Sequence, residues 1–200
     1  DGKLIEHDRE ANKPKGYETR HVYATEIHAW YARSFYPDQK MSGDLKKAFA
    51  NYMARAEKQW LTQNVYEQGL IALTMLRNNE PLVADAIIKS LKETAQQSDD
   101  MGMYWGKNLL GYFWYESPIE TQSLLIGLFT EAGGNEKAVE EMKIWLLRNK
   151  QTSDWQTTKA TAAACYALLM KQEDWLSPDN TSDIKLGGQE LNELKPGIKD

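Results

Sequence analysis

The chain has 200 residues, 42% of them hydrophobic and 26% charged, which is the balance of a folded globular domain with a sizeable core. Its net charge of −5 and pI near 5.4 argue against nucleic acid as a partner, because phosphate binding requires a concentrated basic face. No apolar run approaches the roughly 18 residues of a membrane span, so we expect no membrane contact by this segment. The chain begins at Asp1 without an initiator Met or an apolar signal region. We therefore expect a removed signal or a piece of a longer polypeptide.

The N-terminal part predicts a polar lead-in followed by two helices. Residues 1–20 form the lead-in, with room for a short strand at 3–7. The first helix is expected over 21–35, because Pro37 disfavours helical geometry in the residue before it. The second is expected over 43–61, with Ser42 as its N-cap. Its apolar residues form one stripe, which leaves four basic residues on the outer face: Lys46, Lys47, Arg55 and Lys58.

Two further helices and an irregular aromatic stretch follow. Residues 65–76 are apolar nearly all round, which predicts burial on both sides. Residues 81–95 begin with Pro81 in the first turn. The positions expected to face inward in that helix are Leu82, Val83, Ala86, Ile87 and Leu91. The irregular stretch, 96–116, predicts a hairpin-like arm with extended segments at 103–105 and 111–115.

The C-terminal half carries the clearest helix boundaries. Ser117, Pro118 and Glu120 stand in capping-box register, and the helix that they open is expected to end at Gly133-Gly134. A helix over 136–149 is predicted to bury one face: Val139, Met142, Trp145 and Leu146. A last apolar helix is expected from Thr157 to about Gln172. Beyond it lie a turn-rich linker and a hairpin that bends at Gly187-Gly188.

Two kinds of helix alternate along the chain. The apolar kind aligns without gaps as TEIHAWYAR (25–33), QGLIALTML (68–76), TQSLLIGLF (121–129) and TAAACYALL (161–169). The helices between them are amphipathic, so the apolar set is predicted to form an inner layer and the amphipathic set an outer layer. Short connections make successive helices antiparallel, which gives all the inner helices one direction.

Two all-α architectures satisfy this pattern, namely an open α-solenoid and an α/α toroid. Trp60, Trp105, Trp114 and Trp155 all precede inner helices and would gather at one end of a ring, which favours the toroid, complete or as an arc. We therefore expect a lead-in over 1–20 and a toroid of helical hairpins over 21–176. Residues 177–200 are expected to be a linker and a β-hairpin of an adjacent β domain.

Two segments carry a resemblance to a known family. WYESPIETQSLLIGLF (114–129) followed by KAVEEMKIWLLRNKQTSDWQTTKATAAACYALL (137–169) resembles the thioester-domain region of bacterial α2-macroglobulins. The matching positions are Trp145-Leu146-Leu147, Trp155, Thr158, Thr161 and Ala167-Leu168. The likeness is strongest over about 112–176, and the helical pattern extends it back to about residue 20.

The resemblance implies a non-catalytic helical domain of a large endopeptidase inhibitor that traps proteases in the periplasm or at the outer cell envelope. Its implied partners are neighbouring β domains of the same polypeptide and, through the full-length protein, the target proteases. The family's reactive Cys-x-Glu-Gln motif is absent, because the single cysteine, Cys165, is followed by Tyr-Ala-Leu. Either the motif lies upstream of Asp1 or this member lacks a thioester.

The residues predict no catalytic, cofactor or metal site. His21 and His28 share one helix face but have no third ligand, and Cys165 is expected to be a buried small hydrophobe. The acids that flank the aromatic loops are Asp99, Asp100, Glu116, Glu120 and Asp154, of which Glu120 is expected to serve as a cap. A carbohydrate-active toroid enzyme that uses paired acids remains an alternative, as does a helical scaffold for protein interaction.

An aromatic cluster is the candidate interaction surface: Tyr104, Trp105, Tyr112, Trp114, Tyr115 and Trp155. Trp and Tyr often anchor protein contacts, so the cluster is a candidate surface for neighbouring domains or a captured protein. The alternative is a plug that fills the mouth of the ring and keeps its apolar centre dry, which the architecture favours.

Overall fold

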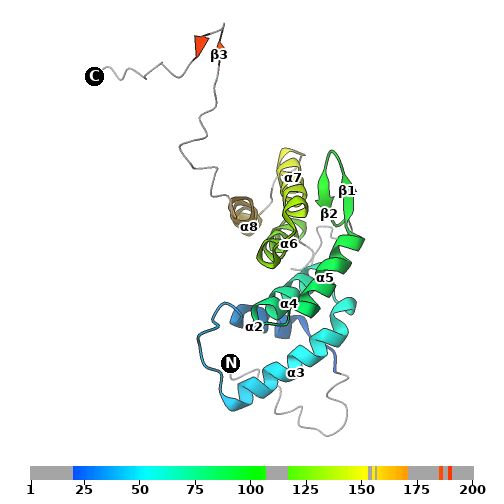
Figure 1. Ribbon diagram of the computed structural model, residues 1–200, viewed down its shortest axis with the longest axis vertical. Helices are drawn as coiled ribbons and strands as arrows, with labels where there is room; N and C mark the ends of the chain where they lie inside the picture. Colours follow the sequence, from blue (N-terminus) through cyan, green and yellow to red (C-terminus); the bar gives the residue numbers. More distant parts are fainter. Residues whose placement is uncertain are drawn as a thin grey trace, which may run out of the picture. The chain divides into compact units, whose positions relative to one another are not determined.

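A computed structural model describes residues 20–106, 117–152, 155, 157–170, 185–186 and 189–190. The chain divides into two compact units, Asp1–Met170 and Lys171–Asp200. The described part of the first unit is mostly helical, as predicted (Figure 1). Its seven α-helices are α2 (Ala24–Arg33), α3 (Gly43–Gln59), α4 (Val65–Arg77), α5 (Pro81–Thr94), α6 (Pro118–Ala132), α7 (Glu136–Thr152) and α8 (Thr158–Leu169). A short 3-10 helix, Trp60–Thr62, follows α3.

Local sequence signals set the helix boundaries. The Ser42 side chain accepts a hydrogen bond from the amide of Leu45 at 3.2 Å, and Thr157 does the same for Ala160 at 3.0 Å. Pro81 and Pro118 occupy first-turn positions, where the missing amide proton is no loss. α6 ends at Gly133, whose φ of 72° favours glycine. The predicted starts of these helices and the predicted end of α6 are confirmed.

The helices of the apolar kind pack on one another in chain order. α2 packs on α4, α4 on α6, and α6 on α8. α5 packs on α4 and α7 on α6, so each amphipathic helix accompanies the apolar helix that precedes it. α3 lies against α2, where Trp30 stacks on Tyr52 with ring centroids 5.9 Å apart. The largest fully buried side chains come from both kinds of helix and include Trp30, Tyr52, Phe129, Ile71, Leu73, Leu91 and Leu125.

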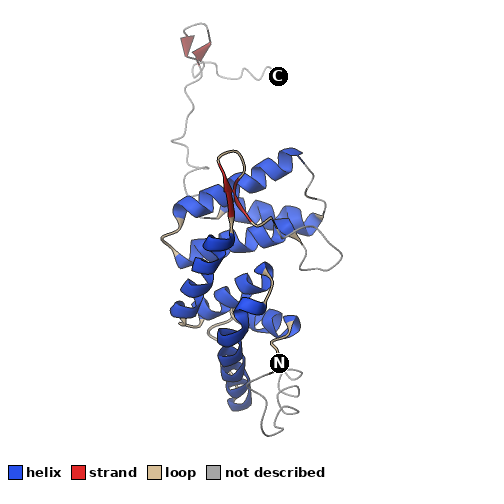
Figure 2. Ribbon diagram, turned by 90° about the vertical axis from the view of Figure 1, so that its right-hand side faces the viewer, coloured by secondary structure: helices blue, strands red, loops and turns tan. Residues whose placement is uncertain are grey.

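A small antiparallel sheet lies beside α7 (Figure 2). It pairs β1 (Gln96–Ser98) with β2 (Gly102–Tyr104). The predicted extended segment at 103–105 overlaps β2, but its partner β1 was not predicted. The second predicted segment, 111–115, lies outside the described residues. Trp105 Nε1 donates to the carbonyl of Leu91 at 3.1 Å, and Gln122 Nε2 donates to that of Met103 at 2.7 Å. These bonds fasten the strands to α5 and α6.

In the second unit, the structure describes two antiparallel strands, β3 (Lys185–Leu186) and β4 (Gln189–Glu190). They flank the predicted bend of the C-terminal hairpin. The lead-in over 1–19, the strand at 3–7 and the linker after 176 lie outside the described residues.

Several predictions of side-chain direction were wrong. Arg55 is buried rather than on the outer face of its helix, because it pairs with Glu26 of α2. Leu82 is 82% exposed and Ala86 is also exposed, because the contacts of α5 come from its other face. The buried positions of α5 are Ala84, Ile87, Ile88 and Leu91. Amphipathic patterning alone did not give the width of the buried stripe.

The last apolar helix is less enclosed than predicted. α8 buries only Ala160, Ala164 and Ala167, while Tyr166 and Leu169 are 71% and 61% exposed. Cys165 is exposed too, so the prediction of a buried thiol was wrong. The helix is apolar all round, but α6 and α7 cover only its small-residue face.

Candidate binding site

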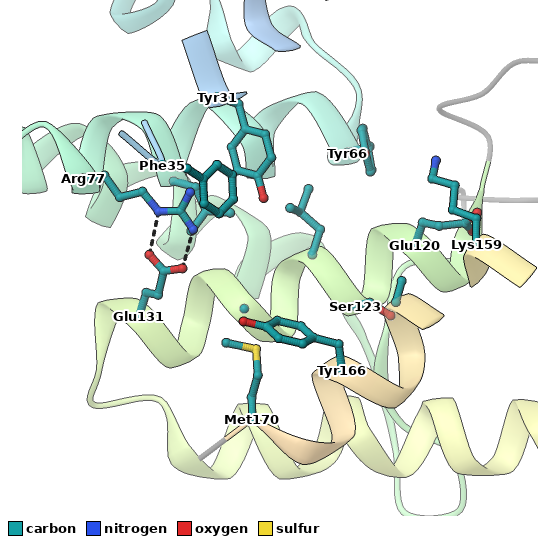
Figure 3. A pocket seen from close by; sticks show the side chains of 14 residues that line it. Tyr31, Phe35, Tyr66, Arg77, Glu120, Ser123, Glu131, Lys159, Tyr166 and Met170 are labelled. Atoms are coloured by element: carbon teal, nitrogen blue, oxygen red, sulfur yellow. Dashed lines mark hydrogen bonds and ion pairs between the residues drawn. The ribbon is translucent and has the colours of Figure 1, made fainter. Parts of the chain in front are cut away.

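A cavity of about 230 Å³ opens among the four helices of the apolar kind. We call it the inner cavity. α4 and α6 line it along with Tyr31 of α2 and Tyr166 of α8 (Figure 3). It is smaller than the roughly 300–1,000 Å³ of sites for drug-sized ligands, so it suits a small molecule or one unit of a longer one.

One end of the inner cavity is built around Arg77 of α4. Its guanidinium binds both carboxylate oxygens of Glu131 on α6, with Nε 2.9 Å from Oε2 (Figure 3). The same group lies over the ring of Phe35 at 4.2 Å and over Tyr31 at 5.4 Å. A third hydrogen bond of the guanidinium runs from NH1 to the hydroxyl of Ser34 at 3.1 Å. Bidentate pairing and ring stacking hold the guanidinium in one orientation.

The opposite end gathers Tyr66 of α4, Glu120 of α6 and Lys159 of α8, which all line the inner cavity (Figure 3). Burial, together with nearby Tyr31 and Glu120, raises the pKa of Tyr66 to about 12. His28 lies against the Tyr66 ring, with centroids 5.8 Å apart. Burial first, and the Lys159 charge second, lower the pKa of His28. At neutral pH both groups are therefore uncharged.

The floor between the two ends is small and apolar. Gly127 of α6 leaves room there, since a Cβ built on it would meet only the Met170 sulfur, at 3.9 Å. Leu73, Leu124 and Ala163 complete this floor. The apolar floor, the aromatic rings and the charged ends make the inner cavity a site for a ligand with one apolar face.

The carboxylates of the inner cavity do not form an acid–base pair for glycoside hydrolysis. Glu120 and Glu131 are eleven residues apart on α6, which is about 16 Å along the helix axis at 1.5 Å per residue. Inverting and retaining glycosidases hold their acids within roughly 5–9.5 Å. Asp99 and Asp100 lie in the exposed turn between β1 and β2, while Glu116 and Asp154 lie outside the described residues.

Glu120 was predicted to complete a capping box with Ser117. The Ser117 side chain accepts no capping hydrogen bond, and Glu120 lines the inner cavity instead. Pro118 fixes the start of α6, so the Glu120 carboxylate is not needed as a cap and is available to the inner cavity.

The structure describes three of the six residues of the predicted aromatic surface. Trp105 and Trp155 are buried, and Tyr104 is half-buried against Trp145, with ring centroids 6.0 Å apart. These three side chains therefore pack within the first unit rather than projecting from it. Tyr112, Trp114 and Tyr115 lie outside the described residues.

Of the residues that line the inner cavity, sequence reasoning singled out only Glu120 and missed the others. The available signal was a tyrosine or a charge within an otherwise apolar helix, as at Tyr31, Tyr66, Arg77 and Tyr166. Among the described residues, no group of three His, Cys, Asp or Glu side chains could hold a metal ion. None of the helices in the described part is long and apolar enough to cross a membrane.

Comparison of the chain with protein-family models, with curated proteins and with solved structures finds no match.

Proposed function

We propose that this chain is a non-catalytic helical domain of a bacterial α2-macroglobulin-like inhibitor that traps proteases in the periplasm or at the outer cell envelope. The proposal rests on the residue pattern over about 112–176, where Trp145, Trp155 and Thr161 carry the resemblance to the family. The resemblance brings with it neighbouring β domains of the same polypeptide as partners.

The observation that carries the proposal furthest is the packing order of the helices. In an α/α toroid, inner helices neighbour one another around a centre and each outer helix covers its own hairpin. An arc of such a ring requires inner helices that pack in chain order, as α2, α4, α6 and α8 do. It also requires an outer helix beside each hairpin, the place that α3, α5 and α7 take. A hollow lined by all four inner helices agrees with a concave inner side.

Of the two alternatives for the thioester, the proposal takes the member that lacks one, in which trapping is non-covalent. The chain has one cysteine, Cys165, with no Glu-Gln after it, so it holds no thioester motif of the family's kind. The packed Trp105 and Trp155 act as structural elements of the domain, in keeping with a plug rather than a contact surface.

The proposal is tested on the full-length polypeptide that contains this chain. The purified protein is incubated with trypsin, and the mixture is separated by size-exclusion chromatography and by denaturing electrophoresis. We expect trypsin to cleave the inhibitor at one segment, to co-elute with it, and to be released intact by denaturant. Trypsin inactivated beforehand at its active-site serine is the control and should not be retained.

Two results would contradict the proposal. Trypsin that elutes separately after cleaving the polypeptide shows that nothing is trapped. Hydrolysis of an oligosaccharide by the same preparation would instead support the carbohydrate-active alternative, despite the long separation of Glu120 and Glu131.

A further inference from the structure

We infer that the inner cavity is a binding site for a single neutral pyranose unit, free or at the end of an oligosaccharide. The inference concerns the cavity between α2, α4, α6 and α8 and is independent of the proposed protease trapping. It assigns binding without hydrolysis, since the two cavity carboxylates are too far apart to act on one glycosidic bond.

The size of the inner cavity and its opening to solvent limit what it can bind. At about 230 Å³ the inner cavity falls below the range for drug-sized ligands and has room for one small ring. Tyr166, which forms one wall, is 71% exposed, so the site communicates with solvent. A chain of several sugar units would therefore present only its terminal unit.

The rings of the inner cavity provide the stacking surface. Tyr31 and Phe35 lie at one end, Tyr66 at the other, and Tyr166 faces them from α8 (Figure 3). A pyranose has an apolar C–H face that packs on an aromatic ring, and a polar edge of hydroxyls. Tyrosine suits both, since it offers an apolar ring together with a polar hydroxyl. Burial raises the pKa of Tyr31 as well as that of Tyr66, so both hydroxyls remain protonated donors at neutral pH.

The charges at the two ends give no preference for a ligand of either sign. Arg77 and Glu131 form one balanced end, and Lys159 and Glu120 the other, so the formal charges of the inner cavity cancel. A charged ligand would therefore meet one like and one opposite charge at each end, with no net attraction. A hydroxyl both donates and accepts, so it can bond to a carboxylate and to a cation at the same end. Hydrogen bonds to charged partners are also stronger than those between neutral groups.

The test uses the 200-residue chain, uniformly labelled with ¹⁵N, and five probes. The probes are methyl β-D-glucopyranoside, methyl β-D-galactopyranoside, methyl N-acetyl-β-D-glucosaminide, cyclohexanol and N-acetyl-tyrosinamide. We expect at least one glycoside to shift the amides of Gly127 and Tyr166 saturably, with a dissociation constant on the order of 1 mM. Cyclohexanol, which has the apolar ring but a single hydroxyl, should bind at least about tenfold more weakly.

A filling variant makes the test specific to the inner cavity. Gly127→Leu should occupy the floor without disturbing the fold, because a Cβ there meets only ordinary contact and leucine is the better helix former. It should abolish the glycoside shifts. Tyr166→Ala should weaken binding at least about fivefold through the lost ring. Tyr23→Ala is the matched control, because this half-exposed tyrosine lies outside the cavity and its loss should leave the affinity unchanged.

Three outcomes would overturn the inference. No glycoside saturates the shifts by about 50 mM, well above the expected constant. In the second outcome, cyclohexanol binds as tightly as the glycosides, which would show that the site recognises only an apolar ring. Or N-acetyl-tyrosinamide binds while the glycosides do not, which makes it a site for a peptide side chain. Thermal unfolding of each variant verifies that lost binding is not lost folding.

Discussion

Arg55 of α3 and Glu26 of α2 form a two-point ion pair that is almost completely buried, with side chains 3% and 5% exposed. The Arg55 NH1 atom lies 3.0 Å from Glu26 Oε2, and NH2 donates to Oε1. The two residues are 29 positions apart in the chain, so the pair fixes α3 against α2. A planar guanidinium suits this geometry, because its paired donors match the two carboxylate oxygens.

Removing one partner of this pair should destabilise the first unit strongly. Arg55→Ala leaves the Glu26 carboxylate buried without its partner, and we expect a loss of about 3–5 kcal/mol in the free energy of unfolding. Urea denaturation followed by tryptophan fluorescence measures this loss. The double variant Glu26→Leu/Arg55→Met should be far closer to wild type, since it buries no charge. Equal losses in the single and double variants would show that packing, not charge, dominates here.

Gly102 allows the β1–β2 hairpin to lie directly on α7. Its φ is 70°, and a Cβ built there would lie 2.1 Å from the carbonyl oxygen of Glu141, so any side chain clashes with backbone. We expect Gly102→Ala to cost about 2–4 kcal/mol. Gly43→Ala is the control, because no atom lies within 4 Å of its Cβ position and the helix should gain slightly. Equal unfolding midpoints for the two variants would contradict the close contact.

The lowered pKa of His28 makes stability depend on pH. The native state favours the neutral imidazole, so the unfolded chain binds the proton more readily, and stability falls as pH drops through the ordinary value of 6.5. NMR titration should give a His28 pKa below 6.5. Lys159→Gln should raise that pKa but not restore it fully, because burial is the larger cause. An unchanged His28 pKa in this variant would show that the Lys159 charge does not act on His28.

The exposed thiol of Cys165 gives a direct check on α8. Because it is the only cysteine, native protein should react completely with a water-soluble thiol reagent, at a rate close to that in urea. If the Cys165 thiol reacted more than about a hundredfold more slowly in the native state than in urea, opening of the structure would cost about 3 kcal/mol. That result would mean that this face of α8 is covered.

Much of the helical organisation could be predicted because its signals are local. Ser42, Pro81, Thr157 and Gly133 act within a turn of where they stand, so the boundaries they mark were right. β1 gave no signal, since Gln96–Ser98 is polar and exposed and has no alternation of apolar residues.

Features that depend on distant residues could not be predicted in this way. Arg55 is charged and was placed outside, because its partner Glu26 lies on another helix. Glu120 resembled a cap, but in the fold it lines the inner cavity together with Tyr66 and Lys159. Cys165 stands among apolar residues, and only the absence of a packed neighbour in the described structure exposes it.

The most direct test of the proposed function compares small and large substrates of a trapped protease. Trypsin is mixed with excess full-length polypeptide, and its activity is measured on a small chromogenic amide and on casein. Trapping encloses the protease without blocking its active site, so we predict that activity on the amide is retained while activity on casein is largely lost. Equal activity on both substrates, or equal inhibition of both, would contradict the account.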